Sequence, residues 1–528
     1  MFFLRKKLLI LMILFSFLWI EKNSFANEQS KNPTNDNHIK KNRPKIPTPT
    51  PKINSLKIEL SLKEAISLAL ARNFDITIEK LKEEIKKEEI IEKRSKFDTT
   101  FIASGESEKS KNETVSTAST GSTKKVNSTQ NVQAGFKKKI LSGAQLSMLF
   151  DWDREGTNSK NNLFDPNFST GLTLSVTQPL LRNFGVDLNS ADIRIATENL
   201  RQSRNEYNNK ITKIVTDVEL SYWDLILAIR NLKLKKKSLE LARDLLRRNK
   251  IQVKIGTLTK IEILDAKTSV AMREDELIVA KREVLENEDA LKLLLNVSIR
   301  SRTSRIALKP TSNLDFKRIQ INEFDLFEKA LSRRTDLIKD KIEIQKRKIK
   351  INKKRNLLLP KLDFTSSLKN SSKQDSTQKA LKRQFSNKGY EISGKLAFEF
   401  PLGNREAKSN YRKSKNEYYE AKEIFKKNKQ IILEEVQNIS RKTKTSMKRI
   451  KTTLLAKKLA AQRLEVQEQK FALGLATSRQ ILEDQESLEN ASLNYIRALI
   501  NYKKNLAMLR KTTQTTLSFF KISLSKTK

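Results

Sequence analysis

The chain has 528 residues with no cysteine and one histidine, and its formal net charge is +44 at pH 7. The lack of cysteine excludes disulfides, thiolate metal sites and a lipid anchor on cysteine, and one histidine cannot supply a His-rich metal cluster. The lysines are spread along helical patterns with glutamates between them, so we interpret them as solvated helix faces. We therefore expect no enzymatic activity, no cofactor and no nucleic-acid partner.

The first residues predict export. Three basic residues at positions 5–7 precede an apolar run from Leu8 to Ile20, and Ser24-Phe25-Ala26 places small residues where a signal peptidase cleaves. That run is too short for a retained membrane helix, and no later stretch approaches the ~20 apolar residues that a spanning helix needs. Any insertion into a membrane is therefore expected to use β-strands.

Alternating sequence predicts strands in two regions. Apolar and polar residues alternate over 172–177 and 396–400, the period of a strand with one apolar face. Weaker candidates are 97–102, 132–140, 144–152 and 362–368. The segments 106–130 and 369–388 have the composition of exposed loops, and an additional hairpin turning at 141–144 leaves the number of strands open. The pattern suits a transmembrane barrel.

The distribution of proline and glycine predicts long helices. No proline occurs between Pro179 and Pro310 or after Pro401, and past the first residues of these stretches the only glycines are Gly256 and Gly474. Because both residue types are costly inside helices, each stretch predicts a long helix, one break and a second long helix.

The two breaks belong to an internal repeat with an offset of 218 residues. The first tip holds Gly256, Thr257, Leu258 and Thr259, and the second holds Gly474, Leu475, Ala476 and Thr477. A heptad ladder of apolar residues shares the offset: Ile263, Val270, Leu277, Val284 and Leu291 correspond to Ile481, Leu488, Tyr495, Tyr502 and Leu509. Each half is thus expected to be a helical hairpin of the coiled-coil type.

The first arm of the first hairpin is expected to run from about Asn189 to Val253. At 1.5 Å per residue it would be roughly 95 Å long, too long for the core of a compact domain. A filament or tether would show the same heptads, but it would not need a strand-rich segment before each hairpin. An exported coiled-coil structural protein of the cell envelope without a pore is the alternative interpretation.

The order of these elements resembles the TolC-type outer-membrane efflux family. The supporting segments are Leu62-Lys63-Glu64-Ala65, Thr177-Gln178-Pro179-Leu180-Leu181-Arg182-Asn183-Phe184-Gly185, Phe400-Pro401-Leu402-Gly403 and the two glycine tips. The resemblance implies an α + β membrane protein, a homotrimer in which a β-barrel in outer-membrane lipid continues as a barrel of long antiparallel coiled-coil helices into the periplasm. It implies export of small molecules or proteins from an inner-membrane pump or ABC exporter, with a periplasmic adaptor protein as a further partner.

The resemblance also implies site residues. The two tips would dock the adaptor, and a periplasmic constriction would use Gln480 and Glu483 after the second glycine and the equivalent Glu262 and Asp265 after the first. The turns at which the chain enters the helices would contain Pro179, Gly185, Pro401 and Gly403.

The expected organisation follows from these elements. The segments are 1–26 signal peptide, 27–55 Pro-rich polar linker, 56–96 helical segment, 97–188 strands and loops, 189–299 helical hairpin, 300–322 connector, 323–359 helical segment, 360–402 strands and loop, 403–511 helical hairpin and 512–528 polar tail.

Overall fold

The structure is a computed structural model that describes residues 53–54, 57–113, 123–158, 163–297, 307–384 and 389–522. The chain divides into two units, Met1–Ile46 together with Ser523–Lys528, and Pro47–Ile522, and every described residue belongs to the second unit. The predicted signal peptide, His38 and nearly all of the predicted linker lie outside the described residues.

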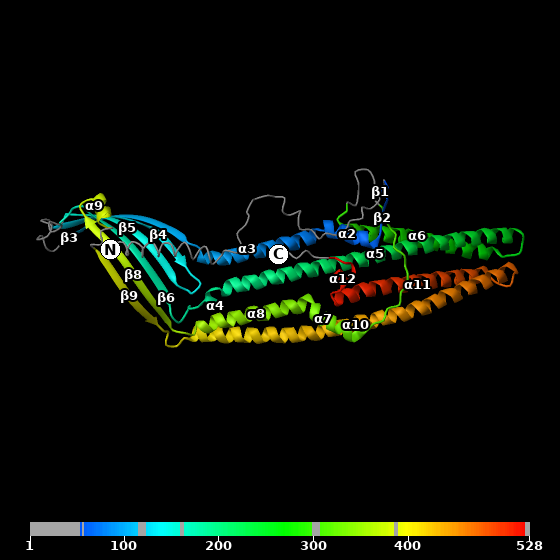
Figure 1. Ribbon diagram of the computed structural model, residues 1–528. Coiled ribbons are helices and arrows are strands. Elements are labelled where there is room, and N and C mark those ends of the chain that lie inside the picture. The colour runs from blue at the N-terminus through cyan, green and yellow to red at the C-terminus, as the bar shows by residue number, and fades with distance from the viewer. Residues whose placement is uncertain are drawn as a thin grey trace. The chain divides into compact units, whose positions relative to one another are not determined.

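Six strands form one antiparallel sheet in the order β3-β4-β5-β6-β8-β9 (Figure 1). The strands are β3 (Thr100–Glu113), β4 (Lys124–Lys139), β5 (Gln145–Thr157), β6 (Asn167–Pro179), β8 (Lys361–Gln374) and β9 (Tyr390–Glu399). Because β6 pairs with β8, the two strand segments of the sequence join into a single sheet. The additional hairpin is present as β4 and β5, which turn at Ile140–Ala144.

Each strand segment is followed by a hairpin of two long helices. The first hairpin consists of α5 (Ala191–Lys254) and α6 (Lys260–Leu295), and the second of α10 (Arg405–Ala472) and α11 (Ser478–Thr512). None of the four contains proline or glycine, which explains their length. With 64 and 68 residues, α5 and α10 are roughly 95–100 Å long. Figure 1 shows the turns of both hairpins at the ends far from the sheet.

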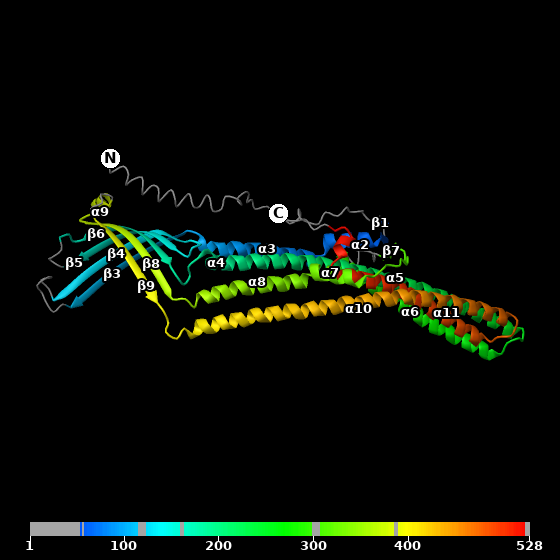
Figure 2. The ribbon, with the colours of Figure 1, turned by 60° about the horizontal axis from the view of Figure 1, so that its bottom comes forward.

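Shorter helices pack along the long arms. α2 (Leu62–Arg72) and α3 (Phe74–Arg94) lie against α5, and α7 (Glu323–Arg333) and α8 (Thr335–Asn356) lie against α10. Figure 2 shows α3 beside α5 and α8 beside α10. Side chains next to the first turn cap the N-termini of three of these helices. A capping box of Ser61 and Glu64 begins α2, and Asn73 and Asn322 cap α3 and α7. Four shorter helices are η2 (Ser95–Phe97), α4 (Val186–Asn189), α9 (Thr377–Gln384) and α12 (Thr516–Phe519).

A second, small sheet joins the two connecting segments to α5. Its strands are β1 (Ile53–Asn54), β2 (Lys57–Leu60) and β7 (Ala307–Pro310). The buried Tyr222 of α5 donates a hydrogen bond of 2.9 Å to the Leu60 carbonyl and accepts one of 3.1 Å from the Ser312 backbone N–H. One side chain therefore satisfies a backbone group just before α2 and another in the connector 300–322.

Four sequence-based expectations need correction. Strands β3 and β4 occupy much of the segment 106–130, and β8 and α9 occupy much of 369–388, so neither segment is simply a loop. Polar side chains do not prevent pairing, because the hydrogen bonds of a ladder are made by the backbone. The two residues of β1 fall within the expected linker, and α12 falls within the expected polar tail.

Candidate functional site

The two faces of the six-stranded sheet differ in polarity. One register row across all six strands is entirely apolar and consists of Phe101, Phe136, Met148, Leu174, Leu368 and Ile392. The neighbouring row, which points to the opposite face, is entirely polar and consists of Thr100, Lys137, Ser147, Ser175, Ser367 and Ser393. In the apolar row every side chain except Leu174 is exposed, so the described residues leave most of this row uncovered.

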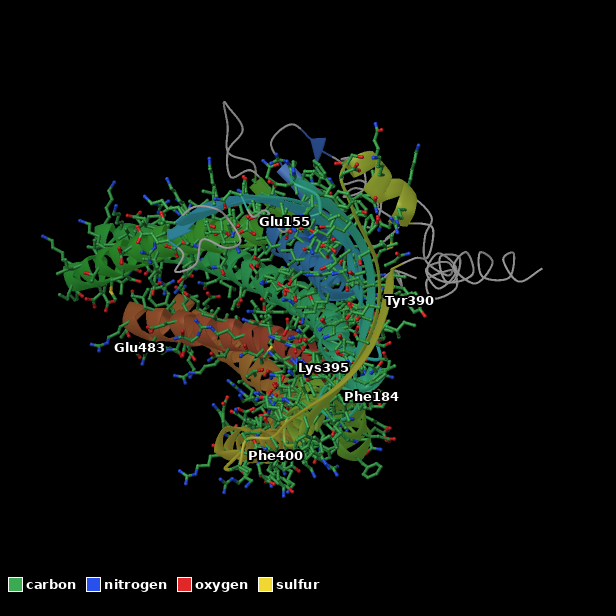
Figure 3. All side chains as sticks on the ribbon, turned by 90° about the vertical axis from the view of Figure 1, so that its left-hand side faces the viewer. Glu155, Phe184, Tyr390, Lys395, Phe400 and Glu483 are labelled. Carbon is green, nitrogen blue, oxygen red and sulfur yellow. The ribbon has the colours of Figure 1, made fainter. Side chains whose placement is uncertain are left out.

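The sheet is curved, with its apolar face on the convex side and its polar face on the concave side. In Figure 3, Tyr390, which shares the apolar face, lies on the convex side of the sheet, whereas Glu155 and Lys395 of the polar face lie on the concave side. On the concave face, hydroxyls bond across strands: Ser147 with Ser175 at 2.6 Å and Ser367 with Ser393 at 2.7 Å. The sheet can thus separate an apolar medium from a polar space.

Both edges of this sheet lack a neighbour within the described residues. There β3 pairs with β4 alone and β9 with β8 alone, and all ten residues of β9 are exposed. Unpaired backbone groups on a long, exposed edge strand form a ready template for another strand. In a membrane, both edges would need further strands, beyond those of the described residues, to satisfy these backbone groups.

The turns between sheet and helices contain the residues that the sequence singled out. Pro179 is the last residue of β6, and Gly185, with φ of 107°, immediately precedes α4, which is followed by α5. Pro401 and Gly403 lie between β9 and α10.

Asparagines that the sequence analysis missed fix the same turns. The Asn183 backbone N–H donates to the Asn356 side chain at 2.8 Å, and the Asn404 side chain donates to the Leu358 carbonyl at 3.2 Å. Asn183 and Asn404 both have positive φ, which asparagine tolerates better than most residues. Their closeness to glycine in the sequence is the signal that could have identified them.

The two tips are built alike. Gly256 and Gly474 have φ of 80° and 75°, and a Cβ at either position would meet nothing within 4 Å. Glycine is therefore favoured at both positions by the positive φ of the backbone, and not by lack of room for a side chain. Thr259 and Thr477 then precede α6 and α11, and Thr477 forms a capping box with Gln480. The first arms end at Lys254 and Ala472, which differ by the same 218 positions as the sequence motifs.

A buried asparagine joins the two tips to each other. Asn249, near the end of α5, is fully buried, and its side-chain amide donates to the Ser478 hydroxyl at 2.7 Å and to the Glu262 carbonyl at 3.1 Å. Beside it, Leu245 of α5 packs with Leu464, Phe471 and Ile481 of the second hairpin. The tips therefore form one contact region, and nothing in the local sequence indicates the role of Asn249.

Charged side chains also connect the hairpins further along. Lys235 of α5 binds Glu276 of α6 at 2.9 Å and also Glu489 of α11. Burial lowers the pKa of the Lys235 ammonium, but the bonds to both glutamates outweigh burial and raise that pKa above its usual value. Arg273 of α6 is buried and donates to the Ser238 carbonyl of α5 at 2.8 Å and to Gln485 of α11 at 3.2 Å.

The four candidate constriction residues lie at the starts of α6 and α11. Gln480 is exposed and accepts hydrogen bonds from the Thr477 backbone N–H and the Gln467 side chain, both at 3.0 Å. Glu483 is exposed and pairs with Arg479 at 3.1 Å. Asp265 is exposed and Glu262 is half-buried. In one chain, Gln480 thus acts in capping and Glu483 in an ion pair within its own helix.

The part of the chain that the structure describes lacks two other kinds of site. No helix in this part of the chain is long and apolar enough to cross a membrane. The same residues contain no group of three or more His, Cys, Asp or Glu side chains placed to hold a metal ion.

Comparison with known proteins gives a consistent result. The family profile described as "Outer membrane efflux protein" matches residues 65–297 and 326–513. The fold is similar to that of the CmeC outer membrane channel of Campylobacter jejuni, with a TM-score of 0.61 and 16% identity over 88% of this chain and 87% of that one. It is also similar to the outer membrane protein VceC of Vibrio cholerae, with a TM-score of 0.61 and 14% identity over 86% and 95% of the two chains. For the MtrE outer membrane channel of Neisseria gonorrhoeae the values are 0.60 and 14%, over 86% and 89%. Among curated proteins, none matches the sequence.

Proposed function

The chain belongs to the outer membrane efflux protein family, and on that premise we propose that three copies form an export duct across the outer membrane and the periplasm. The observation that carries the proposal is the sheet of six strands, which has an apolar row on its convex face and a polar row on its concave face, and whose edges have no partner among the described residues. A pore-less envelope coiled coil has no need of such a sheet.

Closure of the sheet requires other copies of the chain. If β9 of one copy pairs with β3 of the next, three copies supply eighteen strands, a number at which known barrels enclose an aqueous channel. Every edge is then paired, which lipid demands. The exposed apolar row faces the lipid, and the rows of serine and threonine line the channel.

The helical hairpins extend the channel into the periplasm. Because the tips of α5–α6 and α10–α11 lie farthest from the sheet, they are the surface that a periplasmic adaptor and an inner-membrane pump or ABC exporter would meet. The docking residues are those around Gly256 and Gly474, and Gln480, Glu483, Glu262 and Asp265 form the candidate constriction. We propose a purely conducting role, in which the partner supplies the transport energy.

Fractionation and conductance test this function. Expressed in a Gram-negative host, the full-length chain should appear in the outer-membrane fraction, and the purified complex should form ion-conducting pores in a planar lipid bilayer. A chain recovered only in the soluble fraction, or one that never conducts, would contradict the proposal and favour the structural coiled coil.

A further inference from the structure

The two faces differ in their charged residues at the end of the sheet far from the long helices, although Lys125 and Lys373 lie on the concave face. On β3, Lys109 and Lys111 lie on the convex, apolar-row face, while Glu106 and Glu108 lie on the concave face. Glu113, the last residue of β3, also lies on the convex face, so that face of the strand has two lysines and one glutamate, whereas the concave face has glutamates as its only charged residues.

Strand β5 repeats this arrangement at the same end. Arg154 shares the convex face with Trp152, whereas Asp153 and Glu155 point to the concave face. Glu155 is seen on the concave side in Figure 3. Since the whole chain is strongly basic, the informative feature is that these acidic side chains point to the concave face, and not the number of cations.

Helix α9 adds further cations to the convex side. It packs on β6 and β8, and the Trp152 indole N–H donates to the Thr377 hydroxyl at 3.2 Å, which fixes the helix on the convex face. Ala380 is buried in this contact, while Lys379, Lys382 and Arg383 are exposed. Lys379 also binds Asp375 at 2.6 Å.

The position of α9 marks where the apolar band ends. The paired residues Thr170 and Ser372, on the convex face, are 1% and 8% exposed, and Gln384 of α9 is 1% exposed. Polar groups of this kind are costly in hydrocarbon but acceptable at the level of lipid headgroups. Trp152 and Phe168, whose rings are 6.3 Å apart, form the aromatic girdle expected at that level.

We propose that the basic collar, defined as Lys109, Lys111, Arg154, Lys379, Lys382 and Arg383, binds the phosphate groups of anionic lipid headgroups in the outer leaflet. The collar lies directly beyond the apolar face that the lipid tails would cover, so headgroups of the same lipids would meet it. Guanidinium and ammonium groups bind phosphate by charge-assisted hydrogen bonds. This inference rests on the proposed function, because only a membrane-inserted sheet brings the collar to headgroups.

The test is competitive lipid binding to the assembled full-length complex. Native mass spectrometry would count the lipids retained when phosphatidylglycerol and phosphatidylcholine are supplied in equal amounts. The test variant carries Lys379→Gln, Lys382→Gln and Arg383→Gln, and a second variant keeps the charges with Lys379→Arg, Lys382→Arg and Arg383→Lys. A matched control removes two lysines and one arginine from the exposed surface of α10 by Lys442→Gln, Lys448→Gln and Arg449→Gln.

We expect the native chain, the α10 control and the charge-keeping variant to prefer phosphatidylglycerol. The α9 variant should bind it roughly 10- to 100-fold less tightly, because each basic side chain near an anionic surface contributes severalfold. If the α9 variant retained as much phosphatidylglycerol as the native chain, the inference would be overturned. It would also be overturned if the native chain bound inorganic phosphate as tightly as phosphatidylglycerol, because that result would indicate a site for a free anion.

Conductance separates this inference from the proposed function. The α9 variant should conduct in planar bilayers as the native complex does, which shows that it is folded and assembled. A native complex that conducts but binds both lipids equally refutes the collar and leaves the duct standing. A native chain that never conducts contradicts the proposed function, and this inference with it.

Discussion

Removing the Asn249 side chain should loosen the contact between the two tips. The amide is fully buried and joins α5 to the Ser478 hydroxyl and to the Glu262 carbonyl. Asn249→Ala deletes both hydrogen bonds and leaves the buried Ser478 without this donor. We expect the hairpin tips to separate more often while the long helices remain folded.

The size of the effect follows from the two lost hydrogen bonds. Each contributes on the order of 1 kcal/mol, and the Asn249 carbonyl oxygen has no partner among the described residues, which makes its removal favourable. The net loss is therefore about 1–2 kcal/mol, and the open population should rise about 5- to 30-fold.

A cysteine at Ile481 can report that opening. Ile481 is 2% exposed in the cluster between the tips, and the chain has no cysteine of its own, so Ile481→Cys is the single site for a maleimide. When opening is a rapid equilibrium, the labelling rate follows the open population. Asn205→Ala is the control, because among the described residues the Asn205 amide bonds to the Arg201 carbonyl in its own helix and to no other group. An unchanged labelling rate in Asn249→Ala, or an equal increase in the control, would refute this reasoning.

Three further perturbations test other parts of the account. Leu368→Arg, on the apolar face, should lower the free energy of unfolding in lipid vesicles by about 2–4 kcal/mol, measured by urea titration. Ser367→Arg, on the concave face, should lower it little, and equal losses in the two variants would contradict the assignment of faces. Burial raises the pKa of the Asp192 carboxyl, but hydrogen bonds from Lys353 and Lys96 outweigh it and hold that pKa below the usual 3.8. The stabilisation is therefore present above pH 3.8 and lost as the pH falls through the folded-state pKa, so Asp192→Asn should be less stable than the native chain at neutral pH and equal to it in strong acid. Gly256→Ala, at φ of 80°, should strain the first tip by roughly 1–2 kcal/mol and speed the labelling of Ile481→Cys; no change would show that the turn adapts freely.

The sequence was sufficient where structure depends on local backbone demands. Proline and glycine are excluded from long helices, so their absence predicted the four long arms, and Gly256 and Gly474 located both turns. The alternation at 172–177 predicted part of β6 for the same local reason. The acidic and amide positions after each glycine fall at the starts of α6 and α11 because the helix begins directly after the turn.

The sequence was insufficient where structure depends on distant partners. Glu108 lies opposite Thr129 in the β3–β4 ladder, and neither has the composition of a buried strand, so the pairing of their backbones was missed. Helix α9 is held by a hydrogen bond from Trp152 of β5, and its own eight residues have the composition of a loop. Asn249 and Arg273 become informative only when the two hairpins are side by side.

The number of chains in the assembled complex tests the central claim most directly. The edges of the six-stranded sheet have no partner among the described residues, and in this account copies of the chain join there edge to edge. Native mass spectrometry of the complex extracted from the outer membrane counts those copies. The account predicts three chains in one complex. A monomer, or an open-ended series of larger assemblies, would contradict it.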